Sequence, residues 1–445
     1  MLKRIRRRIA RTISEPAADL PADLAYAPPL GMTPIAPDEV WTSDAPLAVA
    51  VHPPGTPRAI ARPAPLFHDD PGGVGLLPDA GAYTFTLPPV FCVAARRVLQ
   101  VGFRSYVTRD GLLFDDESHA PGAEQDRFAA AILSSDPFRN EYTGLAAGAR
   151  PGAFRIDAPS RPVERLDGGT VSLASLEGPN YGSFLFRVVP KLIGCEAWPG
   201  DWRVLTPWLG RTMIDLLGML GLGEDRLVLQ RRDVVYDLER AAIPSFRAAH
   251  AMLDAETVAF YDEIGARYAD PAAGERIFVS RRGWNPEGSG ARVMLNEAEI
   301  AAALEAAGFE TILPHEMSMA EQIRRFASAR IVVGAAGSAM FNTVFCRAGT
   351  IVVDIESEPH WIVAHMNLFG SRGLSYGIFE GETLNRDWNG PHKPFWGDAK
   401  APLGRIRTRT HNGVTAHFDY DSEQRLTTIT NALGHTYRFE YNLRG

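Results

Sequence analysis

The sequence has few cysteines and no long apolar run. Its 445 residues include only three cysteines, Cys92, Cys195 and Cys346, which lie far apart and form no Cys-x-x-Cys pair. This spacing excludes a zinc site or a disulfide framework built from cysteine, and it favours a reducing compartment, so we expect a cytoplasmic protein. No stretch reaches the roughly 18 apolar residues of a membrane-spanning helix, so we expect no such span.

Strong charge of one sign is also missing. The formal net charge is −7, with 22% charged and 45% hydrophobic residues, which is typical of a globular protein with sizeable cores. This balance argues against a disordered chain and against a general nucleic-acid binder. Neither the G-x-x-x-x-G-K-[ST] nor the G-x-G-x-x-G pattern occurs, so the P-loop and standard dinucleotide readings lack their motifs.

The N-terminal part is unlike the rest of the chain. Residues 1–13, MLKRIRRRIARTI, set basic side chains around apolar ones at near-helical spacing, which suits either a frayed, solvated terminus or peripheral contact with an anionic inner-membrane leaflet. No apolar segment follows the arginines, so we expect no secretory signal. Residues 16–82 are rich in proline, alanine and glycine, which predicts an extended linker that wraps a domain.

Regular patterns begin near residue 83 and become clearest after residue 275. Residues 98–108 resemble a strand that ends in a turn at 109–111, and residues 163–175 predict a hairpin closed around 167–169. Strand patterns at 276–280, 309–313, 330–334 and 350–355 alternate with helix patterns at 297–307, 319–329 and 339–345. This alternation predicts a parallel sheet covered on both faces, as in a Rossmann-like domain.

Helix ends support the same assignment. Asn296 with Glu299, and Ser318 with Glu321, have the spacing of capping boxes, and Gly308 stands where a helix C-terminus favours glycine. We expect four segments: an N-terminal segment 1–82, an α/β domain 83–268, a Rossmann-like domain 269–398, and a β-type tail 399–445.

Two loops of the second half stand where α/β sheets bind ligands. Ser280-Arg281-Arg282 follows a predicted strand, and guanidinium groups there suit a diphosphate. The turn from Gly334 to Ser338 lies between a strand and a helix, where glycine lets the backbone approach a ligand. Taken singly, each pattern is more often a surface arginine or an ordinary turn.

In order, these pieces resemble glycosyltransferase family 61. The matching segments are NYGSFLFRVVPKL (180–192), RIFVSRR (276–282), RVMLNEAEI (292–300), the run 308–345 and GTIVVDI (349–355). The resemblance implies a GT-B-like α/β fold of two Rossmann-like domains facing a cleft. It also implies a bacterial, inverting hexosyl- or pentosyltransferase that takes a nucleotide sugar, often UDP-linked, to a glycan acceptor in surface or capsular polysaccharide synthesis.

The resemblance also assigns residues by position. The implied donor-binding residues are Ser280, Arg281, Arg282, Asn296, Glu297, Gly334, Gly337, Ser338 and Asn342. The implied acceptor-side residues are Asn180, Tyr181, Ser183 and Arg187. A buried amide needs a partner, which favours ligand contact for Asn342, whereas Ser318 and Glu321 fit a capping role equally well.

Several positions depart from the family pattern. Ser183, Phe184 and Arg187 stand where members usually carry histidine, tryptophan and an acidic residue, and Ala336 replaces a histidine of the glycine turn. An arginine cannot take the acceptor proton. The remaining candidates for the base are Glu177, His315, Glu316 and His360. We expect no cofactor and no metal requirement, since arginine and a helix N-terminus can neutralise the leaving diphosphate.

Two alternatives stay open. The first is a catalytically degenerate protein of the same fold that binds a glycan or nucleotide without turnover. The second rests on the tail, where Phe418-Asp-Tyr-Asp is echoed by Phe439-Glu-Tyr-Asn. This echo resembles the YD repeat of Rhs-type shell proteins, which would make the chain an Rhs-associated fragment. Because solenoid repeats need neighbours, we expect the tail alone to be a marginal hairpin or disordered.

Overall fold

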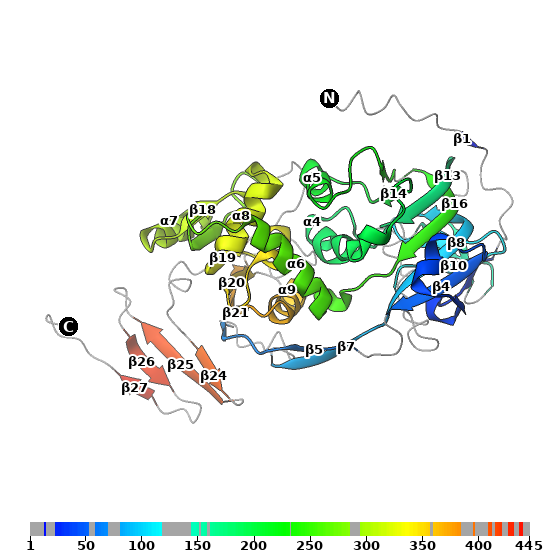
Figure 1. Cartoon of the computed structure of the whole chain (residues 1–445). Helices are drawn as coiled ribbons and strands as arrows, with labels where there is room; N and C mark the ends of the chain where they lie inside the picture. Colours follow the sequence, from blue (N-terminus) through cyan, green and yellow to red (C-terminus); the bar gives the residue numbers. More distant parts are fainter. Residues whose placement is uncertain are drawn as a thin grey trace. The chain divides into compact units, whose positions relative to one another are not determined.

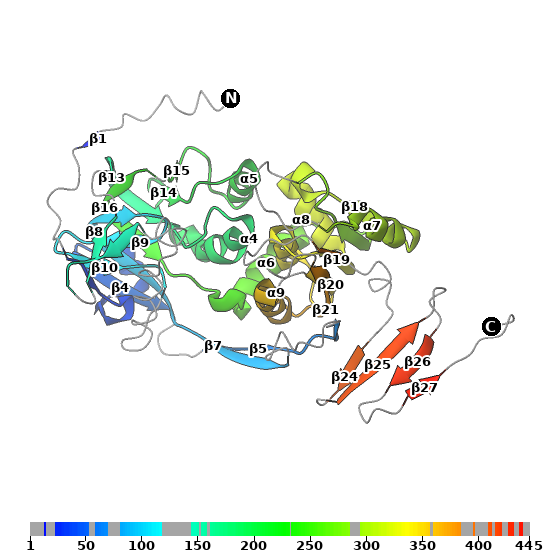
Figure 2. The same cartoon turned by 180° about the vertical axis from the view of Figure 1, so that it is seen from behind.

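Two separate sheets organise the chain, one in each of two units. The first unit comprises Met1–Arg58 and Thr86–Ala249, and the second comprises Ala59–Phe85 and His250–Gly445. Figures 1 and 2 label their elements. The structure is a computed structural model, and it describes residues 13–14, 23–52, 58–69, 81–117, 144–150, 153–157, 161–231, 233–284, 294–356, 359–383, 395–396, 408–411, 414–420, 426–430 and 436–438.

The sheet of the first unit mixes parallel and antiparallel strands. Its long order is β15-β14-β13-β16-β8-β9-β10-β2, in which β13 to β16 run parallel and β8 runs antiparallel to β16. The described strands of this sheet are β1 (Ile13–Ser14), β2 (Ala25–Tyr26), β3 (Thr33–Pro34), β4 (Leu47–His52), β8 (Val90–Val101), β9 (Ser105–Val107), β10 (Leu112–Phe114), β13 (Val163–Ser172), β14 (Arg203–Thr206), β15 (Leu227–Leu229) and β16 (Val235–Pro244). The predicted turn at 109–111, between β9 and β10, is confirmed. The single strand predicted at 98–108 is wrong, because the chain reverses at 102–104 and β9 pairs antiparallel with β8.

Strand β13 corrects the predicted hairpin at 163–175. Both halves of β13 pair in parallel with β16, and the register shifts between Leu166 and Gly169, which marks a β-bulge. Gly168 has φ +80°, and a Cβ on Gly169 would lie 2.1 Å from the Trp202 ring. The hairpin prediction is wrong because these two glycines kink one strand instead of reversing the chain.

Short helices complete the first unit. The helical segment that begins at Tyr181 changes from α-helix to π-helix and then to 3₁₀ helix. Such π-helical turns are often found at functional sites. The helices are η1 (Pro29–Gly31), η2 (Pro37–Trp41), α4 (Tyr181–Ser183), η3 (Phe184–Val188), η4 (Val189–Leu192), η5 (Cys195–Ala197), α5 (Arg211–Met219) and η6 (Ala249–Ala251), and a two-stranded sheet pairs β11 (Leu145–Ala147) with β12 (Phe154–Ile156).

The proline-rich segment contributes strands to both units. Within residues 16–82, β4 pairs with β8 of the first sheet, and β6 (Phe67–Asp69) pairs in parallel with β21 (Ser375–Glu380) of the second. Strand β5 (Arg58–Arg62) pairs with β7 (Tyr83–Leu87) in a two-stranded ribbon. The described residues of this segment thus combine strands with the short helices η1 and η2, and the prediction of a linker is wrong for β4 and β6, which pair with strands of the sheets.

The second unit has a parallel sheet of order β18-β17-β19-β20-β21-β6. Its strands are β17 (Arg276–Val279), β18 (Glu310–Ile312), β19 (Ile331–Ala335), β20 (Ile351–Glu356), β21 and β6, and its helices are α6 (Ala255–Tyr268), α7 (Glu297–Ala306), η7 (Pro314–Glu316), α8 (Met319–Ser328), η8 (Ser338–Phe345) and α9 (Pro359–Ser371). This confirms the predicted alternation and the α/β class. The helix expected at 339–345 is a 3₁₀ helix.

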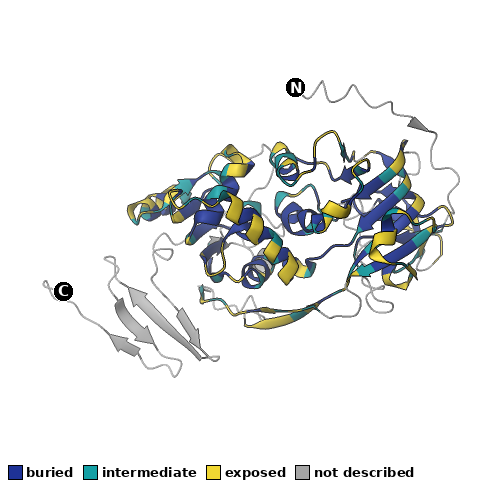
Figure 3. Cartoon of the chain, in the orientation of Figure 1, coloured by how far each residue is buried: buried dark blue, intermediate teal, exposed yellow. Residues whose placement is uncertain are grey.

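The chain order reverses beside β17, so helices cover both faces. Since β18 and β19 flank β17 on opposite sides, right-handed connections place α7 and α8 on opposite faces. Ile300 and Leu304 of α7 share a buried cluster with Phe278 and Val333 of the sheet. Figure 3 shows the central strands coloured mostly as buried, while the helices expose one side.

The predicted helix ends are confirmed in position, with one difference in chemistry. The Ser318 hydroxyl accepts a hydrogen bond from the Glu321 amide (3.2 Å). The Glu321 carboxylate binds Arg324, whose hydrogen bond lowers the pKa of Glu321 below its usual value. The Asn296 side chain makes no cap hydrogen bond. Gly308 has φ +82°, as its place after α7 requires.

The C-terminal segment forms a sheet of its own. Four described antiparallel strands, β24 (Thr408–His411), β25 (Val414–Tyr420), β26 (Leu426–Thr430) and β27 (Thr436–Arg438), follow the short pair β22 (Glu382–Thr383) and β23 (Phe395–Trp396). The tail is therefore neither the predicted single hairpin nor disordered within its described residues, while the YD resemblance stays a prediction. Residues 1–12, with the basic cluster, lie outside the described residues. Within the described part of the chain, no helix has the length and apolarity to cross a bilayer.

The bulge of β13 makes a testable prediction about stability. Replacing Gly169 by alanine places a methyl group on the Trp202 indole, and such overpacking costs about 1–3 kcal/mol. Gly169→Ala should therefore lower the melting temperature measured by circular dichroism. Gly200→Ala is the matched control, because no atom lies within 4 Å of its added Cβ. Equal melting temperatures for the two variants would contradict this account of the bulge.

Candidate donor-binding edge and acceptor-side cluster

The loop after β17 is held by one carboxylate. Glu297, the first residue of α7, accepts hydrogen bonds from the Ser280 hydroxyl (2.5 Å) and from the backbone amides of Arg281 (2.7 Å) and Arg282 (3.2 Å). Ser280 is buried, whereas Arg282 is exposed. Glu297 therefore fixes the direction of the loop that carries both arginines, which gives this predicted donor residue a positioning role.

Arg281 reaches across to the turn that follows β19. Its guanidinium Nη1 donates to the Ala336 carbonyl (3.0 Å), and a Cβ on Gly337 would lie 2.8 Å from the same nitrogen. A Cβ at position 337 would therefore displace the Arg281 guanidinium from this turn. A Cβ on Gly334 would lie 2.5 Å from the Met340 sulfur, so that glycine serves the packing of η8.

These two loops meet where the sheet order reverses. Strands β17 and β19 are neighbours, with Val279 opposite Gly334, and both end at this edge. In open α/β sheets, ligands bind outside the carboxyl ends of the strands at such a reversal. The structure thus brings Ser280, Arg281, Gly337 and the half-buried Ser338 to one edge. A guanidinium fixed at this edge suits an anionic ligand such as a diphosphate.

The buried amide of Asn342 has a protein partner. Its Nδ2 donates to Gln322 of α8 (3.0 Å), and the Gln322 Nε2 donates to the carbonyls of Pro314 (2.8 Å) and Met317 (3.3 Å). Asn342 is fully buried and Gln322 nearly so. This network ties η8 and α8 to η7, so the partner that the sequence analysis sought for Asn342 includes another side chain of the same unit.

The remaining candidate residues of the second unit are His315, Glu316, Asn296 and His360. His315, in η7, packs against Trp284, with 5.5 Å between ring centroids. The exposed Glu316 carboxylate lies 3.7 Å from the His315 Nε2. The Asn296 amide lies 3.4 Å from the Glu299 carboxylate. His360 belongs to α9, but its side chain lies outside the described residues.

In the first unit, Glu177 lies beyond the C-terminal end of β13. Its backbone has φ +57°, a left-handed conformation that is strained for a non-glycine residue and that clusters at functional sites. Its carboxylate accepts a hydrogen bond from the Ser183 hydroxyl (3.1 Å). Asn180 caps α4 by accepting from the Ser183 amide (3.2 Å), and Tyr181 opens that helix. The structure thus gathers three of the four acceptor-side candidates around Glu177.

Arg187, the fourth acceptor-side candidate, belongs to a cluster of charges that the sequence analysis missed. It pairs with Glu117 (2.9 Å), and its guanidinium lies over the Phe246 ring (4.3 Å). Glu117 also lies 3.4 Å from Arg104. An acidic side chain is therefore held beside the position where the family usually carries one. In the sequence, the acidic run 115–117, which follows the apolar stretch 112–114, was the signal for this cluster.

The deepest part of this cluster is a buried ion pair. Lys191 Nζ lies 2.9 Å from Asp116 and 2.7 Å from the Ala174 carbonyl, and both charged side chains are fully buried. Ser175 donates to the same carboxylate (2.7 Å). Burial lowers the pKa of Lys191, while Asp116 opposes that shift. Removing either partner would leave a buried charge, so the pair is part of the structural support of the segment 181–192.

A second polar pair was also missed. His365 of α9 contacts Asp354 through Nδ1 (2.6 Å), and both residues are buried. The imidazole packs edge-on against Phe341, with 4.8 Å between centroids. Asp354 is a charged residue inside the apolar strand pattern 350–355, which was the signal in the sequence. The carboxylate fixes the ring orientation within this core.

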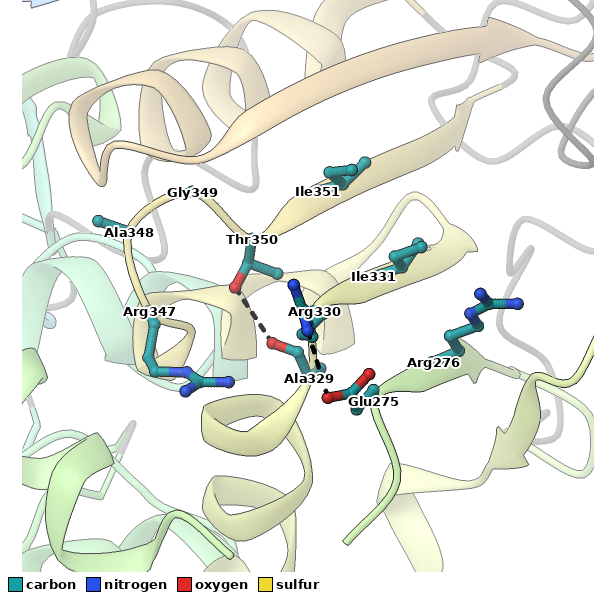
Figure 4. A pocket seen from close by; sticks show the side chains of 10 residues that line it. All are labelled: Glu275, Arg276, Ala329, Arg330, Ile331, Arg347, Ala348, Gly349, Thr350 and Ile351. Carbon is teal, nitrogen blue, oxygen red and sulfur yellow. Dashed lines mark hydrogen bonds and ion pairs between the residues drawn. The ribbon is translucent and has the colours of Figure 1, made fainter. Parts of the chain in front are cut away.

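A hollow lies at the opposite edge of the second sheet. Figure 4 shows it at the N-terminal ends of β17, β19 and β20, lined by Arg276, Arg330, Arg347 and Glu275 among others. Arg276 donates to Ala307 after α7, and Arg347 reaches the Ser328 carbonyl of α8. Arginines at helix C-termini satisfy free carbonyls and favour the helix dipole. We therefore assign Arg276 and Arg347 a structural role.

No group of three or more histidine, cysteine, aspartate or glutamate side chains is placed to hold a metal ion within the described part of the chain. The three cysteines are unpaired, with Cys346 buried and the other two half-buried. Burial raises the pKa of Cys92 and of Cys346 to about 12. Thiolate chemistry is therefore disfavoured at these two sites. The expectation that no metal is required stays a prediction.

Comparison with known proteins gives one family match. Residues 181–353 match the family model described as Glycosyltransferase 61. The matched range begins at α4 and ends within β20, so it includes the loop held by Glu297 and the turn at Gly337. No curated protein matches the sequence.

The role of Glu297 is testable without any ligand. Glu297→Ala removes charge-assisted hydrogen bonds worth about 1.5–3 kcal/mol each, so the amides of Arg281 and Arg282 should exchange with deuterium about tenfold faster or more. Hydrogen exchange read by mass spectrometry on peptides covering 277–284 measures this. Glu299→Ala, an exposed neighbour on the same helix, should leave the rates unchanged. Wild-type rates in Glu297→Ala would show that the carboxylate does not hold the loop.

Proposed function

We propose that this chain, a glycosyltransferase of family 61 by the match of residues 181–353, is an inverting enzyme. Its donor is a nucleotide sugar. The donor is UDP-linked and the acceptor is a glycan of a surface or capsular polysaccharide. The observation that carries the proposal is the contact of Arg281 with the turn at Gly337, at the edge where the parallel sheet reverses its order.

The donor side of the proposal rests on electrostatics. A sugar leaves its nucleotide as charge builds up on the diphosphate, and fixed donors that face this charge stabilise the transition state. Arg281 carries a permanent positive charge and is held at both ends, by Glu297 through its amide and by Ala336 through its guanidinium. We therefore assign the diphosphate to Arg281, with Arg282 and Ser338 beside it. This charge takes the place of a metal in the proposed reaction.

The acceptor side requires a base. In an inverting transfer, the acceptor oxygen bonds to the anomeric carbon as the bond to the diphosphate breaks, and the acceptor proton moves to a protein group. We assign this role to Glu177, because its carboxylate is oriented by Ser183 and its backbone is held in a strained conformation. His315, Glu316 and His360 stay candidates from the sequence.

These assignments give the two units different roles. We propose a GT-B-like enzyme in which the second unit binds the donor and the first, with Asn180, Tyr181, Ser183 and Arg187, presents the acceptor. The family supports this division. The unpaired cysteines support a cytoplasmic location, and the basic residues 1–13 support contact with the inner membrane.

Nucleotide binding tests the donor assignment. At 100 times Kd, a bound ligand adds about 2.7 kcal/mol, which raises a melting temperature by about 2 °C or more. In a panel of UDP, GDP, CMP, TDP and ADP, with and without Mg²⁺, UDP should give this shift without the metal, and Arg281→Ala should abolish it. Arg330→Ala, at the opposite edge, is the control and should keep the shift. A flat panel for the wild type would contradict the proposal.

A substitution at Glu177 tests the assignment of the base. Glu177→Gln keeps the size and the hydrogen bond to Ser183 but removes the proton acceptor, so kcat for sugar transfer should fall by about 10²- to 10⁴-fold. The KM for the donor should stay unchanged, since the first unit is assigned to the acceptor. Glu196→Gln, at an exposed position of the same unit, provides the comparison. An unaltered kcat in Glu177→Gln would move the role to another residue.

A further inference from the structure

A large aromatic side chain stands exposed in the loop that carries the donor arginines. Trp284 is 53% exposed and follows Arg281 and Arg282 after one glycine. Its backbone amide donates to the Arg281 carbonyl (3.0 Å), so a tight turn links the indole to the arginine. Gly283 makes this turn possible because its φ is +81°.

The indole is supported from one side. His315 packs against Trp284 with 5.5 Å between centroids and an angle of 50° between the rings, and the His315 side chain is 18% exposed. The His315 Nε2 lies close to Gly283, 3.5 Å from where a Cβ would be. We call Trp284 and His315 together the aromatic ledge.

Hydrogen bonds hold the His315 side of the ledge in place. His315 belongs to η7, whose first carbonyl, at Pro314, accepts a hydrogen bond from Gln322 (2.8 Å). Gln322 in turn accepts from the buried Asn342 (3.0 Å). Asn342, which the family resemblance marks as donor-binding, thus acts through Gln322 to hold the short helix that carries His315. An aromatic ring held in place while exposed loses little conformational entropy when it binds a ligand.

We propose that Trp284 is the stacking platform for the nucleobase of the donor nucleotide. This inference rests on the proposed function, because it takes the diphosphate to lie at Arg281. The ledge joins the loops after β17 and β18, whereas Gly337 lies after β19. The ledge therefore lies on the β18 side of Arg281. A nucleoside diphosphate held at Arg281 extends to either side of its phosphates, and the β18 side offers a flat apolar surface.

Stacking also predicts how selective this platform is. Every base has a π-face, so stacking tolerates different bases and adds affinity without reading hydrogen bonds. Trp284 should therefore strengthen the binding of UDP, GDP and ADP alike, and the choice between them must come from other residues. Inorganic pyrophosphate, which has the charge of the diphosphate but no base, should not depend on Trp284.

Titration calorimetry on the full chain separates these contributions. Replacing Trp284 by alanine should weaken UDP binding by between about 5-fold and 150-fold, the range of one base–aromatic stack. Trp284→Phe keeps an aromatic face and should recover most of this affinity. Both variants should bind pyrophosphate like the wild type, and Arg281→Ala should lose both ligands. Trp208→Ala removes an indole that is 59% exposed in the first unit and is the matched control.

The outcomes distinguish the inference from the proposed function. Wild-type affinity for UDP in Trp284→Ala, with binding lost in Arg281→Ala, would overturn the platform and leave the donor site intact. Unchanged UDP affinity together with a raised KM for the UDP-sugar would assign the indole to the sugar ring instead. No binding of any nucleotide by the wild type would overturn both proposals.

Discussion

The carboxylate of Glu297 fixes the edge on which the proposed chemistry depends. Through the Ser280 hydroxyl and the amides of Arg281 and Arg282, it sets the course of the loop after β17. From there the Arg281 guanidinium reaches the turn at Gly337, and the same loop carries Trp284 beside His315. The Glu297 carboxylate at the start of α7 thus positions the loop whose side chains we assign to the diphosphate and to the nucleobase of the donor.

Much of the second unit was predictable because its signals are local. Apolar strands, the N-cap at Ser318 and the glycine after α7 follow from periodicity and backbone geometry, and each is confirmed. The prediction of a hairpin at 163–175 was wrong because a pair of glycines is compatible with a β-bulge as well as with a turn. The packing of Trp202 against Gly169 belongs to the bulge, and it cannot be read from the local sequence. The partners of β4 and β6 were hidden for a related reason, since strand pairing over long separations leaves no local pattern.

Within the site, the sequence indicated residue types but not their contacts. The loop residues Ser280 and Arg281 were identified from their place after a strand, while the ties that hold them are formed by tertiary structure. The pairing of Arg187 with Glu117 shows the limit most clearly. The two residues are 70 positions apart, and from the sequence alone an arginine at an acidic position removes a charge, whereas the fold supplies that charge from the segment after β10.

A crystal structure of the protein bound to UDP tests the central claim most directly. The account predicts the diphosphate beside Arg281 and Gly337 and the uracil over the Trp284 ring. A nucleotide bound instead in the hollow lined by Arg276, Arg330 and Arg347, with residues 280–284 untouched, would contradict it.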